Sequence, residues 1–513
     1  MKVKILKKNY FCGKIKTCIQ KYLYMLLTAY SEKESGMSLK KSAIFILTLA
    51  LTGCVEVPKI SRNGIDNIPS ISFPKDNNKN DDMTLKFSSD NWWKMYNDPV
   101  LNELVNISLE SNKDLKIAKL NIQKAAENIY LAKSENAPYI DLNSDFQRER
   151  TSEHGLTPPP YGGSIFNFGD ITLQSSYTID LFNKFGSLTR EAQYTAIAET
   201  LNSKWVELSV SNQVTKLYGY YIYLTEEEKN LSERENTLKE LESLEKDRIS
   251  IGMGIKESLI EIQQELRTTQ SLVKINYLNQ QLTENNLNLL TGLSAPDKIK
   301  SLLTQIRNKP NLSLYNNLKI PGTVSSDIIR NRPDVEYYLM IINSQEAKLS
   351  ALKSDFYPQF SITGQAGLQS IGFNNLLKSG SFLGVIGASI YLPILDSGRI
   401  KSNYKIAGAD LNIFIEQYNK SVLNAYEDVN NNLLKVKTSW NTIKYEDANL
   451  KSQSELLARD GQRLKLGKIA EYDYTVSKYN WLVSVLDNKQ KHYNLYSQQI
   501  DLVNSLGGSY GVE

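Results

Sequence analysis

The side chains that most often do chemistry are scarce in this chain of 513 residues. It has three cysteines, Cys12, Cys18 and Cys54, and two histidines, His154 and His492. A zinc site usually needs four such ligands at short spacings, which these residues do not provide. The sequence also lacks a glycine-rich phosphate loop, a Ser/His/Asp arrangement and a plausible Cys/His pair. We therefore expect no enzyme activity, no cofactor and no metal site.

Cys54 is the one cysteine in a recognisable context. The basic region Met37–Lys41 is followed by the apolar run Ser42–Leu51 and then by Leu51-Thr-Gly-Cys54. A basic start, an apolar core and small residues before a cleavage site are typical of a secretory signal peptide. The end of the run resembles the bacterial lipobox, in which the cysteine becomes the lipidated first residue. The alternative is an ordinary signal peptide with a chance cysteine.

This reading predicts how the first hundred residues are organised. Residues 37–53 would be a lipoprotein signal peptide, and translation is expected to start at Met37, so that residues 1–36 would not belong to the protein. Cys54 would carry acyl chains such as palmitate, which anchor a protein to a leaflet without spanning it. Residues 54–97 would form an N-terminal anchor and linker, because much of this stretch is polar. By resemblance to bacterial lipoproteins, Val55 rather than an aspartate after the cysteine favours sorting to the outer membrane.

Charge and hydropathy exclude two classes of protein. The net charge is +4, but residues 1–53 hold ten lysines and two glutamates, so that the remainder carries −4. No clustered basic face remains for phosphate, and nucleic acid is not an expected partner. Charged residues make up 23% and mean hydropathy is −0.37. No stretch after residue 53 approaches the ~20 apolar residues of a spanning helix.

A pair of strand patterns occurs twice, about 220 residues apart. Each pattern alternates apolar and polar residues over some ten positions, which is typical of a transmembrane barrel strand, although a half-buried soluble strand looks alike. The strands are expected over 139–148, 170–181, 358–368 and 382–393. Four strands cannot close a membrane barrel, for which eight are the usual minimum. Because open edges are forbidden in lipid, several chains must contribute, and three chains would give twelve strands.

A long helical hairpin pattern follows each strand pair. Helices are expected over 98–136, 186–250, 255–291, 399–466 and 471–505. The helix from 186 to 250 would be about 95 Å long at 1.5 Å per residue. Helices of this length need neighbours, which favours coiled-coil packing. The repetition predicts an internal duplication, with a first repeat over 98–320 and a second over 321–513.

The motifs between these elements carry a family resemblance. In order along the chain after Cys54 they are Trp92-Trp93, Asp98-Pro99, Ala137-Pro138, Asp180-Leu181-Phe182, Arg332-Pro333-Asp334-Val335, Phe356-Tyr357-Pro358, Leu392 to Arg399 and Leu506-Gly507-Gly508. In this order and spacing the chain resembles the TolC superfamily of outer membrane efflux proteins, and within it the OprM/NodT-like outer membrane factor lipoproteins.

The resemblance implies an α+β membrane protein. Three chains, with four strands each, would form a twelve-stranded transmembrane β-barrel in the outer membrane, continuous with a periplasmic α-helical coiled-coil barrel. Such a homotrimer is the channel of a tripartite efflux system. It passively conducts drugs or other small molecules and catalyses nothing. Its partners would be a periplasmic adaptor (membrane fusion) protein, an inner membrane RND-type transporter and outer membrane lipid.

The resemblance also implies roles for residues at the two hairpin turns. The stretch from Arg463 to Asp473 matches the family's second turn, and a ring of this aspartate, one from each subunit, forms the periplasmic gate. Charged rings of this kind filter ions. The alternative is that Asp473 caps the returning helix. Some relatives have a second aspartate three residues on, where this chain has Val476, so a single acidic ring is expected.

The hairpin turns would also contact the adaptor. The expected contact residues are Gly252 and Gly254 in the first turn and Arg463 and Gly467 in the second. Glycine at these turns would permit backbone conformations that are closed to other residues. Ser258 replaces an aspartate of the family in the first turn, which puts a charge role there in doubt.

Two other functions remain open. The same fold could serve as the exit duct of a type I-like protein or peptide secretion system. The chain could also be a structural periplasmic coiled-coil lipoprotein with a small soluble sheet. A heat-modifiable, detergent-requiring trimer would separate both ducts from the structural protein.

Overall fold

The computed structural model describes residues 57–66, 71–72, 85–86, 91–156, 160–311, 323–324, 329–508 and 511–512. The chain divides into two compact units. One comprises Met1–Val57 with Pro393–Asp396, and the other Pro58–Leu392 with Ser397–Glu513. Every element described below belongs to the second unit. Cys54 and the expected signal peptide lie outside the described residues.

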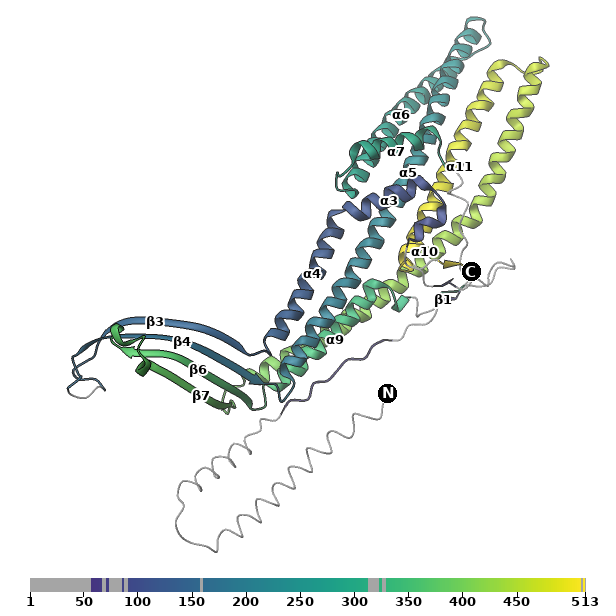
Figure 1. Cartoon of the computed structure of the whole chain (residues 1–513). Helices are drawn as coiled ribbons and strands as arrows, with labels where there is room; N and C mark the ends of the chain where they lie inside the picture. Colours follow the sequence, from purple (N-terminus) through teal and green to yellow (C-terminus); the bar gives the residue numbers. More distant parts are fainter. Residues whose placement is uncertain are drawn as a thin grey trace. The chain divides into compact units, whose positions relative to one another are not determined.

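Two long helical hairpins dominate this unit (Figure 1). The first pairs α5 (Lys184–Ser250) with α6 (Lys256–Leu290), and the second pairs α10 (Arg399–Lys465) with α11 (Glu471–Ser505). The long arms have 67 residues and the short arms 35 in both hairpins. At 1.5 Å per residue a long arm measures about 100 Å. The two hairpins begin 215 residues apart, at Lys184 and Arg399.

The single helix expected over 98–136 is divided. It consists of α3 (Pro99–Ser111) and α4 (Lys113–Ser134), separated by Asn112. The Asn112 side-chain oxygen accepts the Leu115 N–H at 3.0 Å and its amide donates to the Leu290 carbonyl at 3.0 Å. The helical spacing of apolar residues continues from α3 into α4, because a capping asparagine ends one helix and starts the next without changing that spacing. The sequence pattern therefore did not reveal the break.

Shorter helices complete the helical part. The described residues include a 3-10 turn, η1 (Trp92–Tyr96), and the α-helices α7 (Pro296–Asn308) and α9 (Pro333–Ser354). The sequence reading did not predict α7, although Pro296-Asp297 is a typical helix start. None of the helices in the described part of the chain is long and apolar enough to cross a membrane.

Four antiparallel strands form one sheet in the order β3-β4-β6-β7. They are β3 (Tyr139–Arg150), β4 (Ile165–Ile179), β6 (Gln359–Ile371) and β7 (Phe382–Tyr391). The strand expected over 170–181 therefore begins earlier, because Ile165, Phe166 and Phe168 extend the pairing with β3. The loop between β3 and β4 is therefore shorter than expected. Two 3-10 turns, η3 (Phe373–Asn375) and η4 (Ser379–Ser381), lie between β6 and β7.

Two short strand pairs bring distant segments together. Strand β1 (Ile71–Ser72) pairs with β5 (Thr323–Val324), and β2 (Leu85–Lys86) pairs with β8 (Gly511–Val512).

One face of the four-stranded sheet is apolar and uncovered. The register places Leu142 opposite Leu173, Leu173 opposite Ala366, and Ala366 opposite Gly384. Side chains two residues apart share a face, so Ile140 and Ile386 lie on this side too, and they are 71% and 85% exposed. The opposite face is mainly polar, as the alternation predicted. Among the residues that the structure describes, no other element covers the apolar face.

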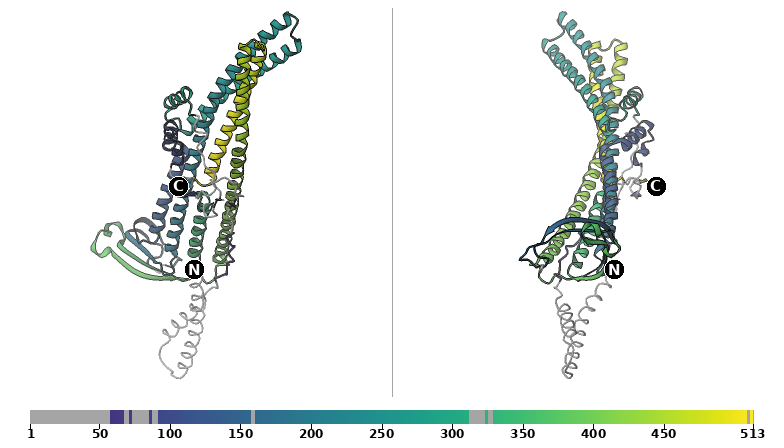
Figure 2. Two further views of the ribbon diagram at one scale, coloured as in Figure 1. Left: turned by 90° about the vertical axis from the view of Figure 1, so that its right-hand side faces the viewer. Right: turned by 60° about the vertical axis from the view of Figure 1, so that its left-hand side comes forward.

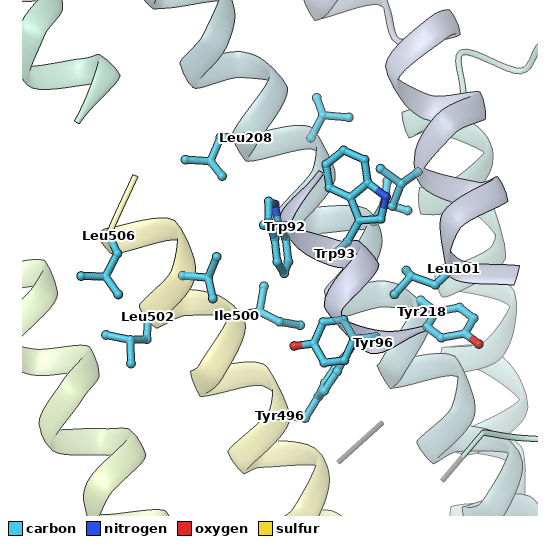
Figure 3. Packing of buried hydrophobic residues seen from close by; sticks show 14 of the residues in the cluster. Trp92, Trp93, Tyr96, Leu101, Leu208, Tyr218, Tyr496, Ile500, Leu502 and Leu506 are labelled. Carbon is cyan, nitrogen blue, oxygen red and sulfur yellow. The ribbon is translucent and has the colours of Figure 1, made fainter. Parts of the chain in front are cut away.

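Part of the hydrophobic core lies where η1 packs on the long helices (Figure 3). Trp92 and Trp93 are buried there, and the Trp92 indole N–H donates to the Ser211 hydroxyl at 3.0 Å. Tyr96 packs against Tyr496 of α11, with ring centroids 5.4 Å apart. Helix α11 contacts α5 between Asn212 and Arg248, and Figure 2 gives two further views of the helices. The tryptophan pair is thus a packing element.

Candidate functional site: the tips of the two helical hairpins

Both hairpin tips end the outgoing helix in the same way. Gly252 and Gly467 have φ of +74° and +63°. The N–H of Met253 donates to the Arg248 carbonyl at 2.8 Å, and the N–H of Lys468 donates to the Arg463 carbonyl at 2.9 Å. This six-to-one bond after a left-handed residue is the Schellman motif, in which glycine avoids a clash of Cβ. The turns lie at residues 251–255 and 466–470, close to their expected positions.

Gly254 is a glycine for a different reason. A Cβ on Gly254 would lie 2.7 Å from the backbone nitrogen of Ile249 and 2.9 Å from the carboxylate of Glu245. That carboxylate is buried and accepts the Ile255 N–H at 3.0 Å, at the start of α6. The first turn is therefore closed tightly over Glu245, and Gly254 allows the close approach.

The two tips present different chemistry to solvent. The first exposes Ile251, Met253 and Ile255, whose exposed fractions are 69%, 72% and 60%. The second exposes one apolar side chain, Leu466, which is 68% exposed, together with the cationic side chains of Lys465, Lys468 and Arg463. The second tip is therefore the more basic of the two, although their backbones turn alike.

Asp473 lies in the first turn of α11 and is exposed. The residue at the N-cap position is Ala470, and no side chain caps this helix through a hydrogen bond. Asp473 therefore does not cap α11 directly, and only the helix dipole favours a carboxylate at this position. Val476 follows one turn later, on the same side of the helix.

A cation–π contact joins the two tips next to Asp473. The guanidinium of Arg248 lies 4.2 Å from the ring centroid of Tyr472. Arg248 also lies 3.4 Å from the Glu245 carboxylate and donates to the Met253 carbonyl. Burial, with the charge of Glu245, raises the pKa of Tyr472. The phenol stays neutral at physiological pH and keeps its ring face available to Arg248.

A second contact between the hairpins lies further from the tips. Arg234 of α5 donates to the Glu265 carboxylate of α6 and to the Tyr479 hydroxyl of α11, both at 3.2 Å. Tyr479 in turn donates to Glu265. Sequence reasoning identified neither Tyr472 nor this cluster, because Tyr472 and Tyr479 lie more than 200 residues from the partners on α5 and α6 and no local spacing relates them.

The structure thus places Gly252 and Gly254 in one tip, and Arg463, Gly467 and Asp473 in the other. Ser258, where the family has an aspartate, lies in the first turn of α6. Among the residues that the structure describes, no group of three or more histidine, cysteine, aspartate or glutamate side chains could hold a metal ion.

Known proteins share both the sequence and the fold of this chain. Residues 104–293 and 324–508 match the family described as outer membrane efflux protein. Toxin and drug export protein A of Aggregatibacter actinomycetemcomitans is 24% identical, over 92% of this chain and 99% of that protein. The solvent efflux pump outer membrane protein SrpC of Pseudomonas putida is 26% identical, over 82% of this chain and 87% of that protein.

Solved structures of outer membrane channels have the same fold as this chain. The Campylobacter jejuni CmeC outer membrane channel has a TM-score of 0.71 at 24% identity, covering 89% of this chain and 94% of the other. The outer-membrane channel OprN has a TM-score of 0.73 at 20% identity, covering 87% and 99%. The fold is therefore that of these channels. The family match covers well over half of the sequence, and the chain belongs to the outer membrane efflux protein family.

Proposed function

We propose that this protein is the outer membrane channel of a tripartite efflux system, through which small molecules leave the cell passively. The observation that carries the proposal is the sheet. It presents an apolar, uncovered face and two edge strands, β3 and β7, that have no partner within the described sheet. Such a sheet is unstable in water and, alone, also unsuitable for lipid, where every edge must be closed.

Three copies would resolve this problem. If β7 of one copy pairs with β3 of the next, three sheets close into a twelve-stranded barrel with no open edge. The face that holds Ile140, Leu142 and Ile386 would then meet lipid, and the face that holds Asp141 and Asp145 would line the lumen. This alternation is the expected arrangement for a transmembrane barrel.

The helical hairpins would continue the duct into the periplasm. Their equal arm lengths and matched glycine turns support an internal duplication, with one repeat over 98–320 and the other over 321–513. Three copies would bring six hairpins together around one axis. Exposed apolar residues on α4 and α10, such as Ile117, Leu120, Ile406 and Ile413, would be covered by neighbouring copies.

The tips would then serve as the gate and as the docking site. Three Asp473 carboxylates at the narrow end would repel one another and attract cations, because charged rings filter ions in this way. A periplasmic adaptor would contact Gly252, Gly254, Arg463 and Gly467. The exposed side chains beside these residues suggest that it offers an apolar surface to the first tip and acidic groups to the second.

The proposed substrates are organic solvents and drugs. Relatives carry names such as solvent efflux pump and toluene efflux pump outer membrane protein, and an inner membrane RND-type transporter would drive the export. A toxin appears beside a drug in the name of one relative. Protein or peptide secretion is therefore the second candidate function. In either case Cys54 would be acylated and would hold the mature N-terminus at the outer membrane.

Accumulation measurements test the proposal. A deletion strain should accumulate more of a fluorescent dye and of several drugs than its parent, and the wild-type gene should restore the lower level. If accumulation is unchanged while a secreted protein disappears from the medium, the secretion duct is the correct function. If neither changes and the protein becomes soluble once Cys54 is replaced, the channel proposal is wrong.

A further inference from the structure

The described segment Pro58–Asp66 lies along α10 rather than forming a free linker (Figure 1). Two asparagines of α10 hold its main chain. The Asn412 side chain accepts the Asn63 N–H and donates to the Ser61 carbonyl, both at 2.9 Å. The Asn419 side chain accepts the Asp66 N–H at 3.0 Å and donates to the Gly64 carbonyl at 3.1 Å.

The distance between the two asparagines along α10 matches the distance between the main-chain groups that they bind. They are seven residues apart, which is about 10.5 Å along a helix. The main-chain groups that they bind are three residues apart, which is about 10 Å along an extended chain. The segment and the helix run in the same direction, since the bonded residue numbers rise together. Each asparagine can therefore bind one N–H and one carbonyl without strain in either element.

Side chains around the two asparagines fit the same arrangement. A Cβ on Gly408 would collide with the Ile60 side chain, so the glycine makes room for it. Asn63 donates to the Glu416 carboxylate at 2.6 Å, and Arg62 forms an ion pair with Glu346 at 2.6 Å. Asn419 is only 5% exposed. A buried amide is costly unless it is hydrogen-bonded, and the segment supplies bonds to both of its ends.

We propose that Pro58–Asp66 is a strap that binds α10 through its main chain, and that Asn412 and Asn419 are the positioning residues that hold it. Both asparagines bind peptide groups, so the N–H and carbonyl positions of the strap set its register on α10, and the side chains of Ile60, Arg62 and Asn63 add to the contact. The strap thereby fixes where the N-terminal tail leaves the helical body.

The strap limits the reach of the tail, a consequence that rests on the proposed acylation of Cys54. Seven residues separate Cys54 from Ser61, and they span at most about 25 Å. Asn412 lies about 20 Å along α10 from Arg399, the first residue of the helix. An acylated Cys54 could therefore reach back to the level at which α10 begins, and not far beyond it.

Limited digestion with trypsin tests the strap. The protein is purified in detergent, and the rate of cleavage after Arg62 is followed by mass spectrometry of the new N-terminus at Asn63. The double variant Asn412→Ala/Asn419→Ala should be cut at least about tenfold faster than the wild type, because a single hydrogen bond is worth roughly a fivefold change in an equilibrium. Asn431→Ala, an exposed change on the same helix, should match the wild type.

Variants of the strap itself leave α10 intact. Asp66→Pro removes the N–H that Asn419 binds and should accelerate cleavage at Arg62. Asp66→Ala keeps this N–H and should behave like the wild type. Ile65→Pro is the control for the proline itself, because neither asparagine accepts the Ile65 N–H. It should accelerate cleavage less than Asp66→Pro. Wild-type rates in the double variant or in Asp66→Pro would overturn the proposal, as would an equal acceleration by Ile65→Pro.

The experiment is repeated on the Cys54→Ser protein. Docking of the strap needs no lipid, so cleavage rates should keep the same order among the variants. Absence of acylation, or failure of the efflux measurements, would then contradict the proposed function and would not affect the strap proposal. Rapid cleavage at Arg62 in otherwise wild-type protein, with or without lipid, would contradict the strap alone.

Discussion

At the scale of residues, glycines of the hairpin tips that look alike in sequence have different physical roles. Gly467 has a positive φ and open space around it, so only the backbone conformation excludes other residues. Gly254 has backbone of Ile249 packed against the place of its Cβ. Sequence reasoning predicted the first role from turn chemistry. It could not predict the second, which depends on how α6 folds back over Glu245.

Gly467→Val should abolish efflux while the trimer remains intact. A β-branched residue at positive φ costs about 1–3 kcal/mol, which would distort the second tip and impair adaptor docking. Dye efflux and trimer content on gels are the two measurements. Gly467→Asn should retain efflux, because asparagine tolerates the left-handed conformation. Gly461→Ala, in the nearby helix, should also be neutral. Normal efflux in Gly467→Val would remove the turn from the docking site.

Asp473→Ala should raise the ion conductance of the channel in a planar bilayer and weaken block by multivalent cations. Three carboxylates are removed together in the proposed trimer, which lowers both the repulsion across the lumen and its attraction for cations. Glu471→Ala, in the same helical turn, makes the same change in charge and serves as the control. If the two variants behave alike, or if Asp473→Ala conducts like the wild type, Asp473 is not the gate.

At the scale of elements, buried polar contacts fix how the hairpins pack. Arg332, at the start of α9, binds Asp334 with two hydrogen bonds of 2.8 and 3.0 Å. It also donates to the Ser505 carbonyl at the end of α11 and lies over the Trp205 ring of α5. These further contacts join α9 to α11 and to α5, and no sequence spacing indicates them.

Glu226 makes the contact between α5 and α11 depend on pH. Although burial raises its pKa, hydrogen bonds from Lys489 and Lys229 outweigh that effect and hold the pKa below its usual value. A carboxylate whose pKa is lowered on folding adds stability above its unfolded pKa and loses it as pH falls through the folded pKa. Stability from Glu226 is thus complete at pH 7 and lost in the acid range, below about pH 4.3.

Glu226→Gln should therefore reduce the melting temperature of the protein at pH 7 and flatten its dependence on pH below 4.5. Circular dichroism in detergent at pH 7 and at pH 3.5 measures both effects. Glu233→Gln, an exposed change on the same helix, should leave the difference between the two pH values unchanged. A pH profile of Glu226→Gln parallel to that of the wild type would show that the pair with Lys489 adds nothing.

At the scale of the whole molecule, the described part of one chain leaves sheet edges unpaired and apolar side chains uncovered. Its sheet has two unpaired edges in the described part, and apolar residues of both sheet and helices face solvent. The proposed trimer would cover these groups, because it would close the sheets into a barrel and bring the helical hairpins together. We expect the protein to require detergent and to run as a trimer on gels unless it is heated.

Cys54→Ser should abolish acylation and leave partial efflux, because the proposed barrel would still hold the body in the outer membrane. Incorporation of labelled palmitate and dye efflux are the measurements, with Cys12→Ser as the control, since Cys12 lies before the expected start at Met37. Complete loss of trimer in Cys54→Ser would show that the lipid is needed for assembly. Labelled palmitate that persists in Cys54→Ser would place the acylation elsewhere.

Local patterns in the sequence predicted most of the elements and the family, although not α7. Alternation of apolar residues predicted all four strands of the sheet, and proline-free helical stretches predicted both hairpins, because these patterns depend on local periods of two and 3.6 residues. Glycine and the residues around it predicted the turns. Boundaries were less certain: β4 starts before residue 170, and Asn112 divides the first helix.

Contacts between distant residues could not be predicted from the sequence and are seen only in the folded chain. The contact of Arg248 with Tyr472, the docking of Pro58–Asp66 on α10 and the burial of Arg332 all join segments that are more than 70 residues apart. Such contacts are selected by packing of the whole chain, through the volumes and hydrogen bonds available in a particular groove. No period or motif encodes them, so the residues that hold the strap were visible only once α10 and the N-terminal segment lay side by side.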